Sequence, residues 1–173
     1  ISLLQLFAHF SYVELTLNQF IDGSYMREDQ PSLLAFGAQY APVDNVRIMA
    51  GYHHFYDTHA KKYGNRQELL DGGTNEYLGG VEWDPIDRLT VSTGVQITRY
   101  GNTDDFMRDL SFVVNSWSFG IGAKYQVSDK VAVQAAYFAT NYDDYTTATT
   151  SDGIQNKFTR TNKVLGLGCE VNF

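Results

Sequence analysis

The residue types that most often carry out chemistry are few in this chain, and their spacing matches no standard reaction centre. The histidines are His9, His53, His54 and His59. His53 and His54 are neighbours in a segment of alternating side chains, so they face opposite sides and do not bind one metal as ligands on a shared face do. A site that joins His53 to Asp57 or His59 stays open as an alternative, and a solvated loop is the simpler interpretation.

Carboxylates offer two further kinds of site. The pairs Asp104–Asp105 and Asp143–Asp144 carry oxygen ligands of the type that Ca²⁺ or Mg²⁺ prefers, but they lack glycine-spaced ligand patterns, which favours an exposed acidic rim. Glu82 and Glu170 have no nucleophile or histidine beside them, which argues against acid–base catalysis. We expect these two side chains to pair with Arg47 or Lys124 inside the protein.

Motifs of the common enzyme classes do not occur. The sequence has no glycine-rich phosphate loop, GxSxG elbow or HExxH. Its single cysteine, Cys169, excludes an internal disulfide framework and a cysteine-rich zinc module. Cys169 falls in the apolar phase of its segment, which predicts an inert, lipid-facing residue. We therefore expect no enzyme activity, no catalytic residue, no metal and no cofactor.

Composition narrows the class of protein. The 173 residues are enough for one domain, and a formal charge of −7 argues against nucleic-acid binding. The 12 Tyr, 11 Phe and 15 Gly, with only 3 Pro, favour β-structure. Apolar or glycine strings reach six residues, at 33–38 and 164–169, which is too short for a transmembrane helix. Because the chain opens at Ile1 rather than Met, we expect a processed product or a fragment.

The elements that position these side chains are indicated by an alternation of apolar residues with polar residues or glycine. It predicts antiparallel strands with one apolar and one polar face. With a poorer segment in residues 1–20, whose apolar phase slips between Tyr12 and Val13, the count is about eight strands. The clear segments are residues 33–41, 46–53, 76–83, 89–98, 117–127, 131–137 and 165–173.

Connections between these segments alternate in length. Residues 41–44, 84–87 and 128–130 form tight turns, whereas the polar stretches 21–32, 57–75, 101–111 and 143–157 are long. Short turns at one end and long loops at the other are typical of an up-and-down antiparallel meander. An outer-membrane barrel has the same layout, with periplasmic turns and extracellular loops.

The contents of the two faces favour the membrane alternative over a soluble sandwich or barrel. Charges lie in the polar phase, with Arg99 as the exception, and so do most strand glycines, which suit a crowded lumen. Lumen-facing candidates for ligand binding are Arg47, Glu82, Gln96, Lys124 and Glu170. Aromatic residues of the apolar phase are expected to form two membrane girdles, Tyr40, Trp83 and Tyr125 beside the short turns and Tyr56, Tyr77 and Trp117 towards the long loops. From Trp117 to Val127 the strand would span roughly 25 Å of membrane.

Several phrases in order resemble one known family. They are residues 51–56 (GYHHFY), 75–84 (NEYLGGVEWD), 111–116 (SFVVNS) and 141–145 (NYDDY). They resemble the C-terminal half of the outer-membrane long-chain fatty-acid and hydrocarbon transporters (FadL/TodX type), most closely the versions from Bacteroides-like bacteria, over residues 33–173. The resemblance implies a barrel of about fourteen strands. It also implies an N-terminal plug and a kinked strand for lateral exit, both in the half that this chain lacks.

The sequence therefore predicts a single all-β domain over residues 1–173, an antiparallel up-and-down transmembrane β-barrel or the C-terminal part of one, in the bacterial outer membrane. The expected function is passive uptake of hydrophobic small molecules such as long-chain fatty acids. The expected partners are membrane lipids, lipopolysaccharide, the hydrophobic substrate and the barrel-assembly machinery, which the resemblance suggests reads the terminal Phe173. A small eight-stranded barrel with a structural or surface-binding role and a soluble lipocalin-like carrier remain as alternatives.

Overall fold

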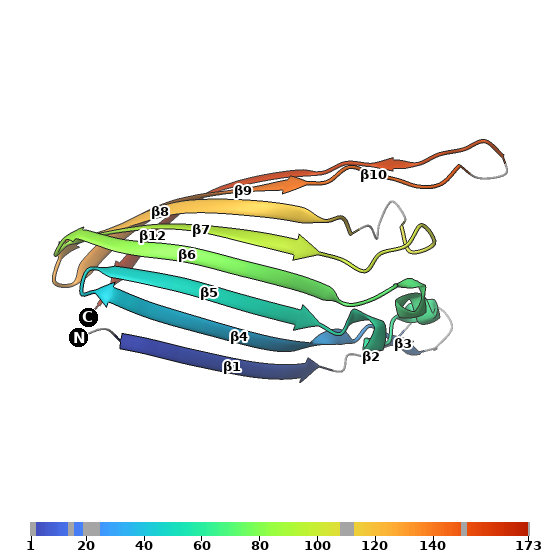
Figure 1. Ribbon diagram of the computed structural model, residues 1–173, viewed down its shortest axis with the longest axis horizontal. Helices are drawn as coiled ribbons and strands as arrows, with labels where there is room; N and C mark the ends of the chain where they lie inside the picture. Colours follow the sequence, from blue (N-terminus) through green and yellow to red (C-terminus); the bar gives the residue numbers. More distant parts are fainter. Residues whose placement is uncertain (1–2, 14–15, 19–24, 108–112, 150–151, 173) are drawn as a thin grey trace.

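The computed structural model describes residues 3–13, 16–18, 25–107, 113–149 and 152–172, and most of them belong to one antiparallel sheet (Figure 1). Its eight strands follow one another in chain order, so the predicted up-and-down meander is confirmed. The strands are β1 (Leu3–Val13), β4 (Gln30–Val43), β5 (Val46–Phe55), β6 (Thr74–Ile86), β7 (Leu89–Arg99), β8 (Ser116–Ser128), β9 (Val131–Tyr142) and β12 (Thr161–Val171).

The remaining elements lie in the long connections. β2 (Thr16–Asn18) pairs with β3 (Tyr25–Arg27), and β10 (Tyr145–Thr146) pairs with β11 (Lys157–Phe158). Two 3₁₀ segments, η1 (Asp57–His59) and η2 (Tyr63–Leu69), follow β5. In the described part of the chain no helix has the length and apolarity needed to cross a membrane.

The short turns are tighter than the sequence predicts, because the strands continue to within two residues of each other at positions 44–45, 87–88 and 129–130. Each hairpin carries a register irregularity near its turn, at Tyr40/Val43, Trp83/Ile86 and Gln126/Ser128. Pro42 and Pro85 lie inside the first two of these irregularities, where a residue without an N–H is tolerated.

The weak first segment is a full strand. β1 pairs with β4 from Leu3 opposite Ala41 to Ser11 opposite Leu33, and the register then shifts before Val13. This irregularity coincides with the slip of the apolar phase near Tyr12. A bulge moves the following side chains to the other face, which explains why the alternation breaks there.

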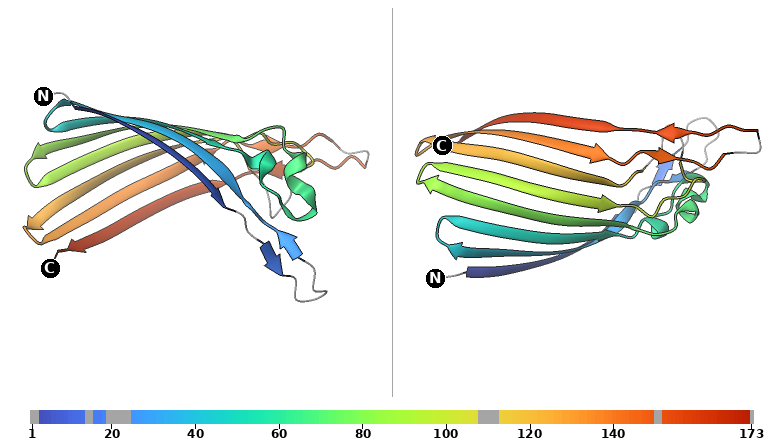
Figure 2. Two further views of the ribbon diagram at one scale, coloured as in Figure 1. Left: turned by 90° about the horizontal axis from the view of Figure 1, so that it is seen from below. Right: turned by 45° about the horizontal axis from the view of Figure 1, so that its top comes forward.

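The two outermost strands of the sheet are β1 and β12, and no ladder joins them in the described residues. They lie at opposite edges of a strongly twisted and curved sheet (Figure 2). The part of the chain that the structure describes is therefore an eight-stranded curved sheet with two edges rather than a closed ring.

Very little of the molecule is a hydrophobic core. Among the described residues the one buried apolar cluster is formed by Met107, Val114 and Phe158, with Tyr142 and Tyr145 against it, at the long-loop end. Large apolar side chains of the sheet lie on the surface instead: Leu6 is 75%, Leu165 is 72% and Leu167 is 81% exposed. This distribution is the reverse of that of a soluble domain.

Hydrogen bonds join two of the long connections in their described parts. The Asp71 amide donates to the Gly101 carbonyl over 3.0 Å, and the Arg66 Nη2 donates to the Phe106 carbonyl over 3.0 Å. Gly101 has no room for a side chain, because a Cβ there would collide with the backbone of Gly72. These contacts join the connection after β5 to the connection after β7.

Candidate ligand groove on the concave face of the sheet

The polar-phase residues and most strand glycines share one face of the sheet, and that face is hollow. A cavity of about 670 Å³ lies on it, lined by residues of β1, β4, β5, β6, β7, β8 and β9. One cavity can touch seven consecutive strands of a single sheet only where the sheet curves around it. We therefore describe this face as concave and the opposite face as convex.

Glycines form the floor of this groove, because the strand register places them side by side. Gly37 lies opposite Gly51 across β4 and β5. Gly80, Gly94 and Gly120 form one continuous row across β6, β7 and β8. A row without side chains leaves the backbone as the surface, which deepens the groove at the middle of the sheet.

Bulky apolar side chains stand beside these glycines on the same face. Across the ladders, Phe7 lies opposite Gly37, Leu78 opposite Gly51, Met49 opposite Gly80 and Phe138 opposite Gly120. All four line the cavity. The middle of the concave face is therefore an apolar band, whereas alternation along each strand predicts a polar face. The band results from the register between neighbouring strands, which no single strand reveals.

A hydrogen-bonded polar collar borders the groove towards the long loops. The His53 Nδ1 lies 3.0 Å from the Glu76 Oε2, and the Gln96 Nε2 donates to the Glu76 Oε1 over 2.9 Å. Gln96 also donates to the Thr98 hydroxyl over 3.2 Å. Each carboxylate oxygen of Glu76 therefore has a hydrogen-bond partner within the collar.

Ion pairs border the groove towards the short turns. The Arg47 guanidinium lies 2.5 Å from Glu82 and 2.8 Å from Asp84, and the Lys124 Nζ lies 2.7 Å from Glu170. The predicted pairing of Glu82 and Glu170 with Arg47 and Lys124 is therefore confirmed. With Gln96 in the collar, the structure brings all five lumen-facing candidates to the concave face.

A second cavity of about 660 Å³ continues the groove towards the short turns. It is lined by Glu82, Lys124 and Gln134, among others, and it shares Ser92, Gly122 and Ala136 with the first cavity. The concave face thus offers a continuous path that passes from the collar through the apolar band to the ion pairs.

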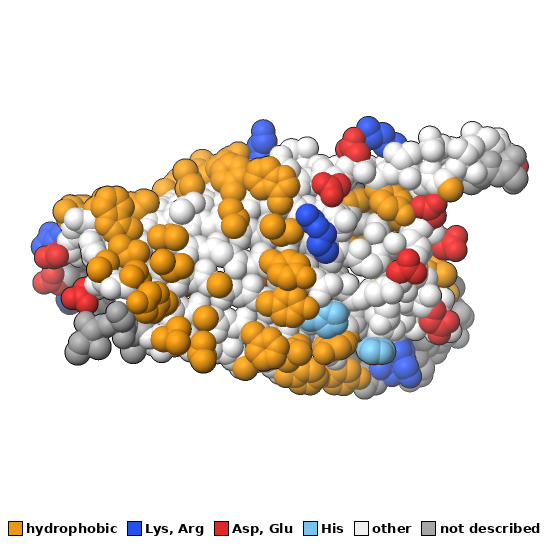
Figure 3. Space-filling model, in the orientation of Figure 1, with side chains coloured by type: hydrophobic (Ala, Val, Ile, Leu, Met, Phe, Trp, Pro, Cys, Tyr) orange, Lys and Arg blue, Asp and Glu red, His pale blue; other side chains and the backbone are white. Residues whose placement is uncertain are grey.

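The convex face carries the residues that the sequence assigns to two aromatic girdles. Tyr40, Tyr77, Trp83, Trp117 and Tyr125 are all exposed on it. Tyr56 follows the last residue of β5, where its ring lies 4.5 Å from that of His54. Hydrophobic side chains spread over much of this face and acidic side chains gather at its two ends (Figure 3).

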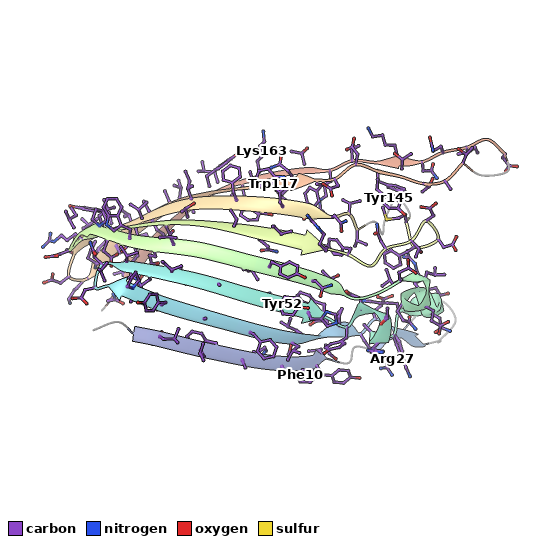
Figure 4. The ribbon with its side chains drawn as sticks, in the orientation of Figure 1. Phe10, Arg27, Tyr52, Trp117, Tyr145 and Lys163 are labelled. Atoms are coloured by element: carbon purple, nitrogen blue, oxygen red, sulfur yellow. The ribbon has the colours of Figure 1, made fainter. Side chains whose placement is uncertain are left out.

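Three features of the convex face go beyond the residues that the sequence assigns to the two girdles. Tyr52 joins the aromatic band, with its ring 5.3 Å from Tyr77, and Phe119 stacks near Trp117 at 6.2 Å. Lys163 shares the face of Leu165 on β12, so Arg99 is not the only charge in the apolar phase (Figure 4). An alternation count that starts at Leu165 misses Lys163 by two residues.

The other candidates for chemistry are not brought together. His54 lies on the convex side, 2.8 Å from the Asn75 Oδ1, whereas His53 lies on the concave side. Asp57 accepts the Thr74 amide over 2.7 Å, and His59 stacks on Tyr56. Among the described residues no group of three or more potential ligands could hold a metal ion.

Hydrogen bonds join the loop after β7 to the connection between β10 and β11. The Asp104 carboxylate accepts the Tyr145 hydroxyl over 2.6 Å and the Ala148 amide over 2.7 Å. These hydrogen bonds hold the pKa of Asp104 below its ordinary value, and the same contact raises the pKa of Tyr145 to about 12. Burial, followed by the nearby Glu76 carboxylate, raises the pKa of Tyr100.

Comparison of the chain with models of known families and with curated proteins gives no match in either case. The resemblance to fatty-acid and hydrocarbon transporters consequently stays a sequence prediction. Phe173, the proposed assembly signal, lies outside the described residues.

Proposed function

We propose that this chain forms the wall, or a section of the wall, of an outer-membrane β-barrel that passes hydrophobic small molecules along its concave face. The observation that carries the proposal is the pairing of an exposed apolar convex face with a glycine-floored apolar groove on the other side. The first face suits lipid, and the second suits a ligand.

The convex face argues for a lipid environment. Removing one large aliphatic side chain from water is worth about 1.5–3 kcal/mol, and Val95, Ile121, Leu165 and Leu167 are among many such side chains on this face. A soluble monomer rarely exposes so continuous an apolar surface. Aromatic residues near both ends of the face match the interfacial belts of membrane barrels.

The direction of curvature disfavours the soluble carrier. A lipocalin-like barrel encloses its apolar face and turns its polar face to water. Here the sheet curves around the face that carries the glycines, the ion pairs and the apolar band, and the leucine-rich face lies outside. In water, this arrangement would expose the leucine-rich convex face to the solvent.

The edge strands favour a section of a larger ring over a self-contained eight-stranded barrel. Backbone groups of an unpaired edge have no partner in a lipid core, so β1 and β12 need further strands. The eight strands leave these edges apart, and additional strands between them would complete the ring.

Passage along the groove needs no chemistry. A hydrophobic molecule would leave the loop side, enter the apolar band between the collar and the ion pairs, and move on by diffusion. Weak, mostly apolar binding allows release as well as capture.

Uptake of an apolar dye by intact Gram-negative cells tests this proposal. Cells that produce the full protein should accumulate N-phenylnaphthylamine several-fold faster than cells that carry an empty vector. Equal rates, with folded protein present in the outer membrane, would contradict the proposed function.

A further inference from the structure

The charges that border the groove restrict the class of molecule that it accepts. Two basic side chains border the groove towards the short turns, and both are paired: Arg47 contacts Glu82 and Asp84, and Lys124 contacts Glu170. One guanidinium with two carboxylates leaves a net negative charge on that side.

The collar adds a second negative charge. Glu76 contacts two residues of the groove lining, His53 and Gln96, and its side chain is only 18% exposed. Gln96 donates its amide N–H groups to Glu76 and Thr98. The amide N–H groups of Gln96 are therefore used within the collar, and the negative charge of Glu76 lies beside the groove.

The described lining of the cavity at the apolar band contains no Lys or Arg, and Lys124, which lines the cavity towards the short turns, is paired with Glu170. Its imidazole side chains are those of His9 and His53. Beyond the collar, Arg160 lies between β11 and β12 and packs over the Tyr142 ring at 4.9 Å.

On this basis we infer that the groove selects uncharged apolar molecules and rejects long-chain carboxylates of the same length. A carboxylate in the apolar band meets Glu76 at one end and the Arg47–Glu82–Asp84 cluster at the other, and the described residues that line the groove include no unpaired cation. Like charges at a binding interface cost much more than an uncharged group of the same shape. This inference rests on the proposed function and restricts its substrate class.

Equilibrium binding of laurate and of its methyl ester to the protein in lipid nanodiscs tests the inference. Empty nanodiscs supply the correction for partition into lipid, and a buffer at about pH 9 keeps laurate ionised. We expect saturable binding of the ester at least about tenfold tighter than that of laurate.

Two variants locate the cause. Glu76→Gln and Glu82→Gln should each tighten laurate binding several-fold and leave the ester unchanged, because each removes one negative charge beside the groove. Asp105→Asn, which removes an exposed negative charge in the loop after β7, is the matched control and should change neither ligand. Unchanged laurate binding in both Glu variants would overturn the inference.

Two other outcomes separate the inference from the function on which it rests. Tighter binding of laurate than of the ester, lost in Arg160→Gln, would assign the headgroup to Arg160 and overturn the inference while the uptake function stands. Absence of saturable binding for both ligands would contradict the groove as a ligand site and with it the proposed function.

Discussion

Phe138 lies directly opposite Gly120 across β8 and β9, and a Cβ added at Gly120 would lie 3.6 Å from the Phe138 ring. The ring therefore lies beside the open space into which a side chain at Gly120 would project. Met49 lies opposite Gly80 and Leu78 opposite Gly51 in the same way, so the apolar band consists of pairs in which a large side chain faces a glycine.

Filling this space should block the groove. Gly120→Leu places its Cβ at ordinary contact distance, so the sheet should fold, while the side chain projects into the cavity. We expect uptake of N-phenylnaphthylamine to fall several-fold. Gly79→Leu, whose Cβ would lie 3.8 Å from Val95 on the convex face, is the matched control. Equal uptake by the two variants would show that the ligand takes another path.

The assignment of the two faces predicts opposite tolerance for a charge at neighbouring positions. Val95 is 56% exposed, and strand alternation places it on the convex face, whereas Gln96 donates to Glu76 in the collar of the concave face. Val95→Arg should destabilise the folded protein in lipid by about 2–4 kcal/mol, and Gln96→Arg should be tolerated. Urea titration of protein folded into vesicles measures both. Similar losses for both variants would contradict the assignment of the faces.

The orientation of the protein in the membrane is expected to follow from the difference between its short turns and its long loops. In a Cys169→Ser background, cysteines at Glu68 or Asp152 in the long loops should react with an impermeant maleimide on intact cells. A cysteine at Asp129 in a short turn should react only after the outer membrane is opened. The inverse labelling pattern would mean that the long loops face the periplasm.

The contact between Asp104 and Tyr145 should make the loop between β10 and β11 sensitive to pH. Since the pKa of Asp104 is lowered, its contribution is complete above the ordinary pKa of an aspartate and is lost as the pH falls through the lowered value. Since the pKa of Tyr145 is raised to about 12, the tyrosine contribution is lost as the pH rises from about 10 towards that value.

The mobility of a nitroxide at position 152, in the Cys169→Ser background, measures this contact. We expect low mobility at neutral pH, higher mobility at both extremes, and high mobility at neutral pH in Tyr145→Phe. Tyr63→Phe, on η2, is the control. A mobility that changes neither with pH nor on loss of the Tyr145 hydroxyl would contradict a role for this contact in holding the loop.

Much of the main sheet could be predicted from the sequence because a strand has a period of two. Alternation alone assigns Val95 and Gln96 to opposite faces, and the slip near Tyr12 marks the irregularity in β1. The pairing of Arg47 with Glu82 follows from the need to neutralise charges on one face.

The groove could not be predicted in the same way. Its apolar band depends on which residue of one strand faces which residue of the next, and that register is set by hairpin geometry. Met49 and Leu78 fall in the polar phase of their own strands, so each looks like an isolated exception until the ladders place them opposite Gly80 and Gly51. The folded loops carry no period at all, and their order comes from contacts such as that of Arg66 with Phe106.

Cell fractionation with heat-modifiable gel migration tests the central claim, a lipid-facing convex surface, most directly. We predict that the intact protein sediments with outer membranes, is released only by detergent, and migrates faster before boiling than after it. Recovery of the folded protein as a detergent-free soluble monomer would contradict the account.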